Sequence, residues 1–251
     1  MEVQVGRRDG TRGSVVWGVL RGVLSARAEQ TGRVRLDVVD AGGGTGGFAV
    51  PLAALGHSVT VVDPSPDSLA AAQRRAAEMN VRISAVQGEA AGLDSVVGEE
   101  TADLVICHSV LEYVDSPADA LAAITRVLRP GGTVSVLAAG AVAAVLHRAL
   151  TGRFDEARAL LEDTGAGQDG GVPRRFTLPG LVALIESVGL APGAAHGAEI
   201  FGGLVPSALV DADPGAAESL RALEAAAATH PALRDIAAKL HLLGRRRDSA
   251  Q

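Results

Sequence analysis

The stretch VVDAGGGTGG, residues 38–47, decides the fold that this sequence predicts. Its aliphatic start followed by a run of glycines is typical of a buried strand that turns tightly into a helix. The glycines fit two spacings, G-x-G-x-x-G from Gly42 to Gly47 and D-x-G-x-G-x-G from Asp40 to Gly46. Both spacings occur in loops that hold a nucleotide-containing cofactor, so the glycines alone leave the cofactor undecided.

The composition predicts a globular protein with an aliphatic core. The chain has 251 residues, of which 47% are hydrophobic and 2% aromatic, and its formal net charge is −6. So few aromatic side chains argue against a base-stacking platform, and the net charge gives no general attraction to nucleic acid or to an anionic membrane. A single cysteine excludes an internal disulfide and a cysteine-rich zinc site. The histidines show no metal-ligand spacing, so no metal is predicted.

Strands and helices alternate through the first two thirds of the chain. Short β-branched runs predict five buried strands, at 36–39, 58–62, 82–86, 104–107 and 133–137. Helical patterns lie between them at 46–55, 67–79 and 118–128, with start signals at Asp67-Ser68 and Asp115-Ser116-Pro117 for the last two. This alternation predicts a parallel sheet covered by helices on both faces, with ligands at the carboxyl ends of the strands.

The remaining segments are more helical. Helices are predicted at 14–28, at 141–162 with a break near Thr151-Gly152, at 176–188 with Thr177 as the cap, and at 214–229. The segment Asp163–Pro173 reads as a flexible loop, and strands are expected at 195–201 and 239–243. We expect one domain, residues 1–251, with an N-terminal helical cap (1–30), a cofactor-binding core (31–140), and lid helices with the final strands (141–251).

Two observations predict a soluble, cytoplasmic protein. The first ten residues, MEVQVGRRDG, lack the basic-then-apolar pattern of a signal peptide. The longest uncharged apolar run, residues 133–146, is too short to span a bilayer.

Charge separates the two interpretations of the glycine loop. A dinucleotide places a pyrophosphate at the start of the helix, and the acid Asp40 just before the glycines would repel it. S-adenosylmethionine (SAM) carries an ammonium and a sulfonium instead, and beside these cations an acid is favourable. Asp63, at the end of the second predicted strand, would bind ribose hydroxyls in either case. The loop therefore favours SAM.

The blocks that follow strengthen this interpretation. VVDAGGGTG, VVDPS, QGEA, DLVICHSVLEYV and VLRPGGTVSV stand in the order and spacing of the class I SAM-dependent methyltransferases, which residues 36–137 resemble. The resemblance implies an α/β, Rossmann-like fold: a seven-stranded, mostly parallel sheet with the last strand antiparallel, helices on both faces and helical lid additions. It also implies SAM as cofactor and S-adenosylhomocysteine as product.

The resemblance can be narrowed to one group. CHSVLEYVDSPADAL, VLRPGG and LHRALTGRFDEA are similar to the bacterial CmoM/SmtA group, which methylates the carboxylate of a carboxymethoxy-modified wobble uridine in tRNA. An N-terminal arginine contacts SAM in that group; Val16 takes its place here, with Arg12 nearby as a substitute. The Tyr-Asn-Ala run of the group is also replaced, by Ala138-Ala139-Gly140. The cofactor-binding residues that we expect are Asp40, Gly42, Gly43, Gly44, Gly46, Asp63, Pro64, Glu89, Ala90, Ala91, His108 and Arg12.

Candidate catalytic residues follow the fourth predicted strand. His108 stands where cofactor and acceptor meet, and a ligand contact is favoured over a role as general base, because a carboxylate acceptor is already ionised. Tyr113 either lines the acceptor pocket or covers the sheet edge. Cys107 follows Ile106 rather than a proline, so a buried structural cysteine is favoured over a nucleophile.

The acceptor stays open between tRNA and a small molecule. The resemblance to the tRNA-modifying group favours the first, whereas the net acidity and the few aromatic residues favour the second. A SAM-binding module without turnover is a further alternative, and a nicotinamide-dependent oxidoreductase is disfavoured by Asp40. Membrane and DNA are not expected partners. Of the basic clusters, only Arg174-Arg175 adjoins the predicted loop and is a candidate substrate contact.

Overall fold

The structure is a computed structural model of the whole chain, and it describes residues 14–162, 173–211, 213 and 215–248. It contains the seven predicted strands: β1 (Asp37–Ala41), β2 (Ser58–Asp63), β3 (Ser84–Gln87), β4 (Ala102–His108), β5 (Leu128–Ala139), β6 (Ala191–Ala198) and β7 (Lys239–Arg245). The larger helices are α2 (Ser14–Thr31), α3 (Ala49–Ala54), α4 (Pro66–Glu78), α6 (Pro117–Val127), α7 (Ala141–Leu150), α8 (Phe154–Glu162), α9 (Leu178–Ser187) and α11 (Ala216–Ala227). Short helices that the sequence pattern did not reveal are η1 (Ala90–Gly92), α5 (Leu93–Val97), α10 (Ser207–Asp211) and α12 (Pro231–Arg234).

The strands form one sheet in the order β3-β2-β1-β4-β5-β7-β6. β1 pairs in parallel with β2 and β4, as do β2 with β3 and β4 with β5. β7 runs antiparallel to β5: at one end of the pair the Gly131 N–H donates to the Arg246 carbonyl and the Arg246 N–H donates to the Gly132 carbonyl, and at the other the Gly140 N–H donates to the Ala238 carbonyl. The predicted mixed sheet with an antiparallel last strand is confirmed.

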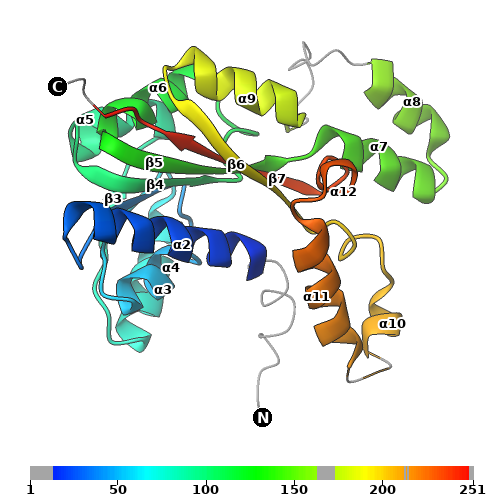
Figure 1. The fold of residues 1–251 in the computed structure, drawn as a ribbon, viewed down its shortest axis with the longest axis horizontal. Helices are drawn as coiled ribbons and strands as arrows, with labels where there is room; N and C mark the ends of the chain where they lie inside the picture. Colours follow the sequence, from blue (N-terminus) through cyan, green and yellow to red (C-terminus); the bar gives the residue numbers. More distant parts are fainter. Residues whose placement is uncertain (1–13, 163–172, 212, 214, 249–251) are drawn as a thin grey trace. The chain divides into compact units, whose positions relative to one another are not determined.

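Contacts divide the chain into two compact units. The sheet unit takes in described residues 22–137, 181–194 and 242–248. The helical unit takes in the described parts of 14–21, 138–180 and 195–241. Within the sheet unit, α3 and α4 lie on one side of strands β1–β4, and α5 and α6 lie on the other (Figure 1). The central strands β1 and β4 are buried on both faces, which explains their almost continuous aliphatic sequences.

Local signals place the helix starts. Ser116 accepts a hydrogen bond from the Asp119 backbone N–H at 3.2 Å and Pro117 occupies the first turn of α6, as predicted. For α4 the expected start at Asp67-Ser68 was late. Ser65 is the cap instead, accepting from the Ser68 N–H at 3.3 Å, because Pro66 suits the first helical position.

In the second half of the chain, one predicted boundary agrees with the structure and two differ from it. The predicted break in 141–162 is confirmed, since α7 ends at Leu150 and α8 begins at Phe154. The strand expected at 195–201 lies earlier, because Glu199 has a φ of +58° and ends the extended backbone. β5 begins at Leu128, so LRPGG belongs to the strand, and a register shift against β4 between Ala102 and Leu104 accommodates it.

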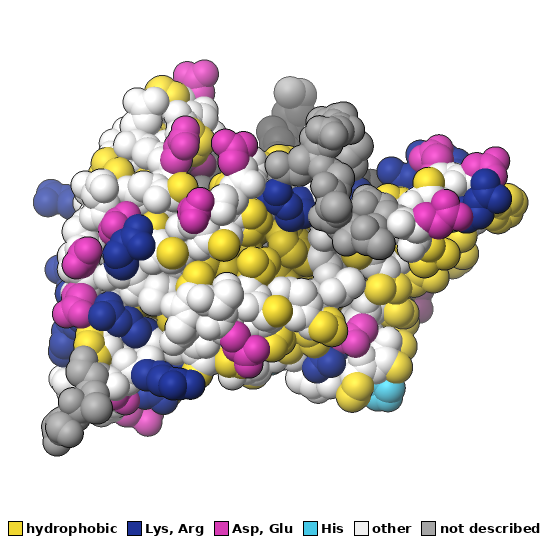
Figure 2. Space-filling view, turned by 90° about the horizontal axis from the view of Figure 1, so that it is seen from above, with side chains coloured by type: hydrophobic (Ala, Val, Ile, Leu, Met, Phe, Trp, Pro, Cys, Tyr) yellow, Lys and Arg dark blue, Asp and Glu magenta, His cyan; other side chains and the backbone are white. Residues whose placement is uncertain are grey.

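Figure 2 shows one face of the molecule, on which basic and acidic side chains are interspersed rather than gathered into a single-sign patch. Among the described residues, no helix combines the length and the apolarity that crossing a bilayer requires.

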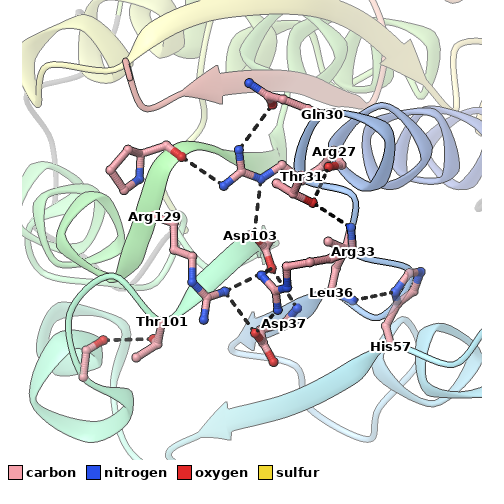
Figure 3. A network of polar contacts seen from close by, with 12 residues as sticks. Arg27, Gln30, Thr31, Arg33, Leu36, Asp37, His57, Thr101, Asp103 and Arg129 are labelled. Atoms are coloured by element: carbon pink, nitrogen blue, oxygen red, sulfur yellow. Dashed lines mark hydrogen bonds and ion pairs between the residues drawn. The ribbon is translucent and has the colours of Figure 1, made fainter. Parts of the chain in front are cut away.

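A buried carboxylate at the amino ends of the central strands ties the end of α2 to the sheet (Figure 3). The Asp103 side chain on β4 is fully buried and accepts from Arg27 at 3.2 Å, Arg33 at 2.9 Å and Arg129 at 3.0 Å. It also accepts from the Asp37 backbone N–H at 3.0 Å. Four donors therefore offset the cost of burying this charge.

Candidate active site

The glycine loop joins β1 to α3 and is held by β2. The Gly42 N–H donates to the Val62 carbonyl at 2.7 Å, and the Gly46 N–H donates to the Gly43 carbonyl at 2.9 Å. The Gly44 N–H donates to Asp63 Oδ2 at 2.9 Å. The parallel register of β1 and β2 sets this arrangement, since Ala41 lies opposite Val62. The loop and the acid that the sequence predicted as cofactor ligands thus meet at one sheet edge.

The structure distinguishes the two glycine spacings. Gly46, which belongs to the spacing that begins at Asp40, has a φ of +78° and packs so that a Cβ would lie 3.1 Å from that of Ala72. Gly47, which the dinucleotide spacing needs, does not have a left-handed φ. A Cβ at residue 47 would meet only the Arg75 guanidinium, at 3.9 Å. The backbone therefore requires glycine at the positions of the D-x-G-x-G-x-G spacing.

Asp40 lies beneath the loop at the end of β1. The residue is 3% exposed, and its Oδ2 has no hydrogen-bond partner among the described residues. The pKa of Asp40 is raised to about 7. Burial is the main cause and the nearby Asp63 adds to it, whereas the backbone hydrogen bond from Ala49 acts in the opposite direction. A cation bound at this oxygen would satisfy it and stabilise the ionised form.

Gly43 is the point of closest approach between the loop and this acid. A Cβ at residue 43 would lie 2.6 Å from Asp40 Cγ and 2.7 Å from Oδ2. Only a glycine therefore leaves the Asp40 carboxyl in its observed position.

Asp63 is positioned by backbone donors at both oxygens. Besides the bond from Gly44, Oδ1 accepts from the Ser65 N–H at 2.9 Å. Asp63 is 8% exposed and the following Pro64 is exposed. Each carboxylate oxygen can accept a further hydrogen bond, so the side chain is oriented yet still able to receive hydroxyl donors.

Three more of the predicted cofactor-binding residues, Glu89, Ala90 and Ala91, follow β3. Asp63 lies opposite Gln87 in the β2–β3 register, which brings the segment after β3 to the same edge as the loop. Glu89 is exposed and precedes η1, Ala90 is buried and Ala91 is exposed.

His108 is the last residue of β4. Its Nε2 lies 2.7 Å from Ser135 Oγ on β5, and its ring meets the ring of Phe48 edge to face with centroids 4.6 Å apart. These two contacts fix the ring orientation. Ser135 and Phe48 were not predicted as site residues; the sequence signal available for Ser135 was a polar residue inside the aliphatic strand TVSVL.

The neighbouring candidates differ in exposure. Cys107 is fully buried, and burial raises the pKa of its thiol, with Glu112 and Asp40 adding to the effect. This favours a structural cysteine rather than a nucleophile. Tyr113 is 71% exposed, whereas Glu112 is 3% exposed. Arg12 and residues 163–172 of the loop predicted at Asp163–Pro173 lie outside the described residues.

Another residue that the sequence did not single out packs against the loop. Val110 occupies the space that a Cβ at Gly42 would need.

No group of three or more histidine, cysteine, aspartate or glutamate side chains within the described ranges is placed to hold a metal.

Comparison with known proteins agrees with this geometry. Residues 39–136 match a family model described as a methyltransferase domain. A SAM-dependent methyltransferase from Mesorhizobium loti has a TM-score of 0.58 at 22% identity, covering 93% of this chain and 99% of that one. A second, from Methanosarcina mazei, has a TM-score of 0.59 at 15% identity, covering 86% and 94%. The chain thus carries the fold of the class I SAM-dependent methyltransferases, and residues 39–136 are similar to a methyltransferase domain.

Curated relatives are similar to part of the chain. The tRNA 5-carboxymethoxyuridine methyltransferase of Escherichia coli (strain K12) is 34% identical over 149 residues, which are 59% of this chain and 56% of the relative. The ubiquinone biosynthesis O-methyltransferase of Methylococcus capsulatus is 39% identical over 112 residues, 44% of this chain and 45% of the relative. The matches thus span about half the length of these relatives.

Proposed function

We propose that the protein transfers a methyl group from SAM to an acceptor. The observation that carries this proposal is the buried Asp40 carboxyl under the glycine loop, with Asp63 fixed beside it by the Gly44 N–H. A buried carboxylate oxygen with no hydrogen-bond partner among the described residues suits a cationic ligand group and disfavours a pyrophosphate.

The residues present fit this cofactor. Asp40 would pair with the ammonium of the methionine moiety, and the loop backbone would lie against it. Asp63 would accept hydrogen bonds from the ribose hydroxyls, and Glu89 with Ala90 and Ala91 would adjoin the adenine. When bound, SAM supplies a methyl group activated by its sulfonium.

The protein's own contribution to the transfer is alignment. An in-line displacement needs the acceptor oxygen held on the axis behind the methyl group, and alignment of this kind supplies much of the acceleration. His108, oriented by Ser135, would contact the cofactor or the acceptor at the end of β4. A carboxylate acceptor is ionised at neutral pH and needs no general base.

The first candidate acceptor is the carboxylate of a carboxymethoxyuridine at the tRNA wobble position. Its support is the similarity to the Escherichia coli enzyme named for that substrate.

A small-molecule acceptor is the second candidate. The net charge of −6 and the mixed charges on the face in Figure 2 offer no extended phosphate-binding surface there, and the ubiquinone-pathway relatives are named for a small-molecule route.

Two measurements test the proposal. Calorimetry should show binding of SAM and S-adenosylhomocysteine by the full chain, and binding of a nicotinamide dinucleotide in their place would contradict it. Transfer of labelled methyl groups should then be assayed on tRNA from a strain lacking this gene and on a small-molecule extract of the same strain. Label in the tRNA supports the first acceptor, label in the extract the second, and cofactor binding with no label in either points to a non-catalytic module.

A further inference from the structure

The helical unit contains an open pocket whose walls come from segments far apart in the sequence. It is lined by α7, by the residue before Phe176, by residues 199–204 after β6, and by residues 236–238 before β7. Its volume is about 200 Å³, and all its lining residues belong to the helical unit.

Most of the wall is aliphatic. Ala143, Ala144 and Leu146 line it from α7, and Ile200 and Ile236 line it from the two later segments. Such a wall favours the apolar body of a ligand. An engineered apolar cavity of about 150 Å³ holds benzene, so a volume of this order suits a molecule with about one ring.

The wall that includes residues 199–204 is held in place from behind. Glu224 is 3% exposed and accepts from the backbone N–H groups of Ile200, Phe201 and Gly202 at 2.9, 2.8 and 2.8 Å. Three charge-assisted hydrogen bonds to one buried carboxylate make this segment a fixed surface. This wall of the pocket is therefore held in place without a ligand.

Arg175 is the polar group that distinguishes this pocket. Its Nε is buried and has no hydrogen-bond partner among the described residues. The backbone beside it is fixed, because the Phe176 N–H donates to the Ala139 carbonyl and the Phe176 carbonyl accepts from the Ala141 N–H, both at 2.8 Å. A buried donor without an acceptor costs about 1–3 kcal/mol, a cost that a ligand oxygen would remove.

The other charges of the lining limit the ligand to one negative charge. Arg148 already pairs with Glu156, Nε to Oε2, at 2.9 Å. Glu199 lines the same pocket and would repel a dianion. A guanidinium binds a carboxylate through two parallel N–H bonds, so a monocarboxylate matches the single uncommitted arginine.

We infer that this pocket binds a small monocarboxylic acid with an apolar body of about one ring, its carboxylate on the Arg175 guanidinium. The inference goes beyond the proposed methyl transfer and does not rest on it. Carboxylate binding is measured in the absence of SAM. A failure to bind the carboxylate therefore leaves the methyl-transfer proposal standing, and a failure to bind SAM leaves the carboxylate site standing.

The test uses the full chain with three probes, benzoate, phenylacetate and 3-phenylpropionate, each beside its neutral primary amide. Ligand-observed NMR and calorimetry should show at least one carboxylate binding about tenfold or more tighter than its amide, a ratio typical of one charge-assisted contact. Arg175→Gln should weaken that binding by about the same factor, and Arg175→Lys should restore part of it. Arg148→Gln is the matched control, since Arg148 lines the pocket but is engaged by Glu156.

Three results would overturn the inference: none of the carboxylates binds at millimolar concentration, the amides bind equally well, or Arg175→Gln binds like the unmodified protein. Circular dichroism and thermal melting check that the variants fold. If Arg175→Gln does not fold, Ala143→Leu decides, because the larger side chain would occupy the pocket. Loss of carboxylate binding in a folded Ala143→Leu protein supports the site, and unchanged binding rejects it.

Discussion

At the scale of single residues, the cofactor loop depends on the contact between Gly43 and Asp40. The glycine has no side chain to displace the carboxyl, and the carboxyl is buried without a donor for Oδ2 among the described residues. An unsatisfied buried acceptor is costly unless a ligand satisfies it. The pair is therefore better explained by ligand binding than by stability.

Gly43→Ala should reduce SAM affinity at least tenfold, because the new Cβ would lie 2.6 Å from Asp40 Cγ and displace the carboxyl. Gly47→Ala is the matched control in the same loop and should bind within about twofold, since a Cβ there meets only a flexible arginine end, at 3.9 Å. Calorimetric dissociation constants of the two variants check this. Equal loss of affinity in both would contradict the assigned glycine spacing.

The pH dependence of SAM binding should follow the Asp40 carboxyl. Its pKa of about 7 means that the carboxylate is formed above neutrality and protonated below it. An ammonium pairs with the ionised form only, so affinity should fall about tenfold per pH unit as pH drops below about 7. The Asp40→Asn variant should bind SAM weakly, and its affinity should not change with pH over the same range. Calorimetry between about pH 5.5 and 7.5 measures the SAM affinity of the unmodified protein and of the variant. The same pH dependence in both proteins would show that a group other than Asp40 titrates.

At the scale of elements, Asp103 joins one helix end to three strands. Arg27 comes from the C-terminal part of α2, Arg129 from β5 and Asp37 from β1, and all contact a carboxylate with no exposed surface (Figure 3). The amino ends of these strands lie opposite the cofactor edge, so this network bears on stability rather than on binding.

Asp103→Ala should lower the free energy of unfolding by about 3 kcal/mol, because it removes the buried acceptor shared by the partly buried side chains of Arg27, Arg33 and Arg129. Asp94→Asn removes a partly exposed pair with Arg126 and should cost no more than about 1 kcal/mol. Urea denaturation followed by circular dichroism compares the two. A small loss for Asp103→Ala would mean that water or neighbouring carbonyls replace the carboxylate.

At the scale of the whole molecule, net charge bears on the acceptor. A chain of net charge −6 must bind tRNA through local arginines alone. Several C-terminal arginines are engaged within the protein: Arg246 pairs with Glu100 at 2.7 Å and donates to the Leu128 carbonyl. Arg245 pairs with Asp248 at 3.4 Å.

Salt dependence therefore tests the tRNA proposal. If tRNA is the acceptor, its Michaelis constant should rise about tenfold or more between about 50 and 200 mM salt, because phosphate contacts release counterions. The Michaelis constant for SAM, measured in the same assays, should stay within about twofold and serves as the control. A Michaelis constant for tRNA that does not change with salt would count against phosphate contacts and favour a small-molecule acceptor.

The sequence by itself determined the fold class and the position of the glycine loop within it. Both depend on short-range patterns: aliphatic runs of strand length, helical periodicity, and glycines spaced after an acid. Parallel strands bring their carboxyl ends to one edge, so the meeting of Gly44 with Asp63 could be predicted without knowing any distance.

Only the tertiary structure decided which side chains meet across the sheet and in the helical unit. Ser135 orients His108 from a neighbouring strand, Asp103 pairs with arginines from three segments, and Arg175 lies in a pocket that Ile200 and Ile236 also line. Such contacts depend on register and packing between segments distant in the chain, which no local pattern specifies. VVDAGGGTGG thus predicts where the cofactor lies, and the packing around it determines what each neighbouring residue can do.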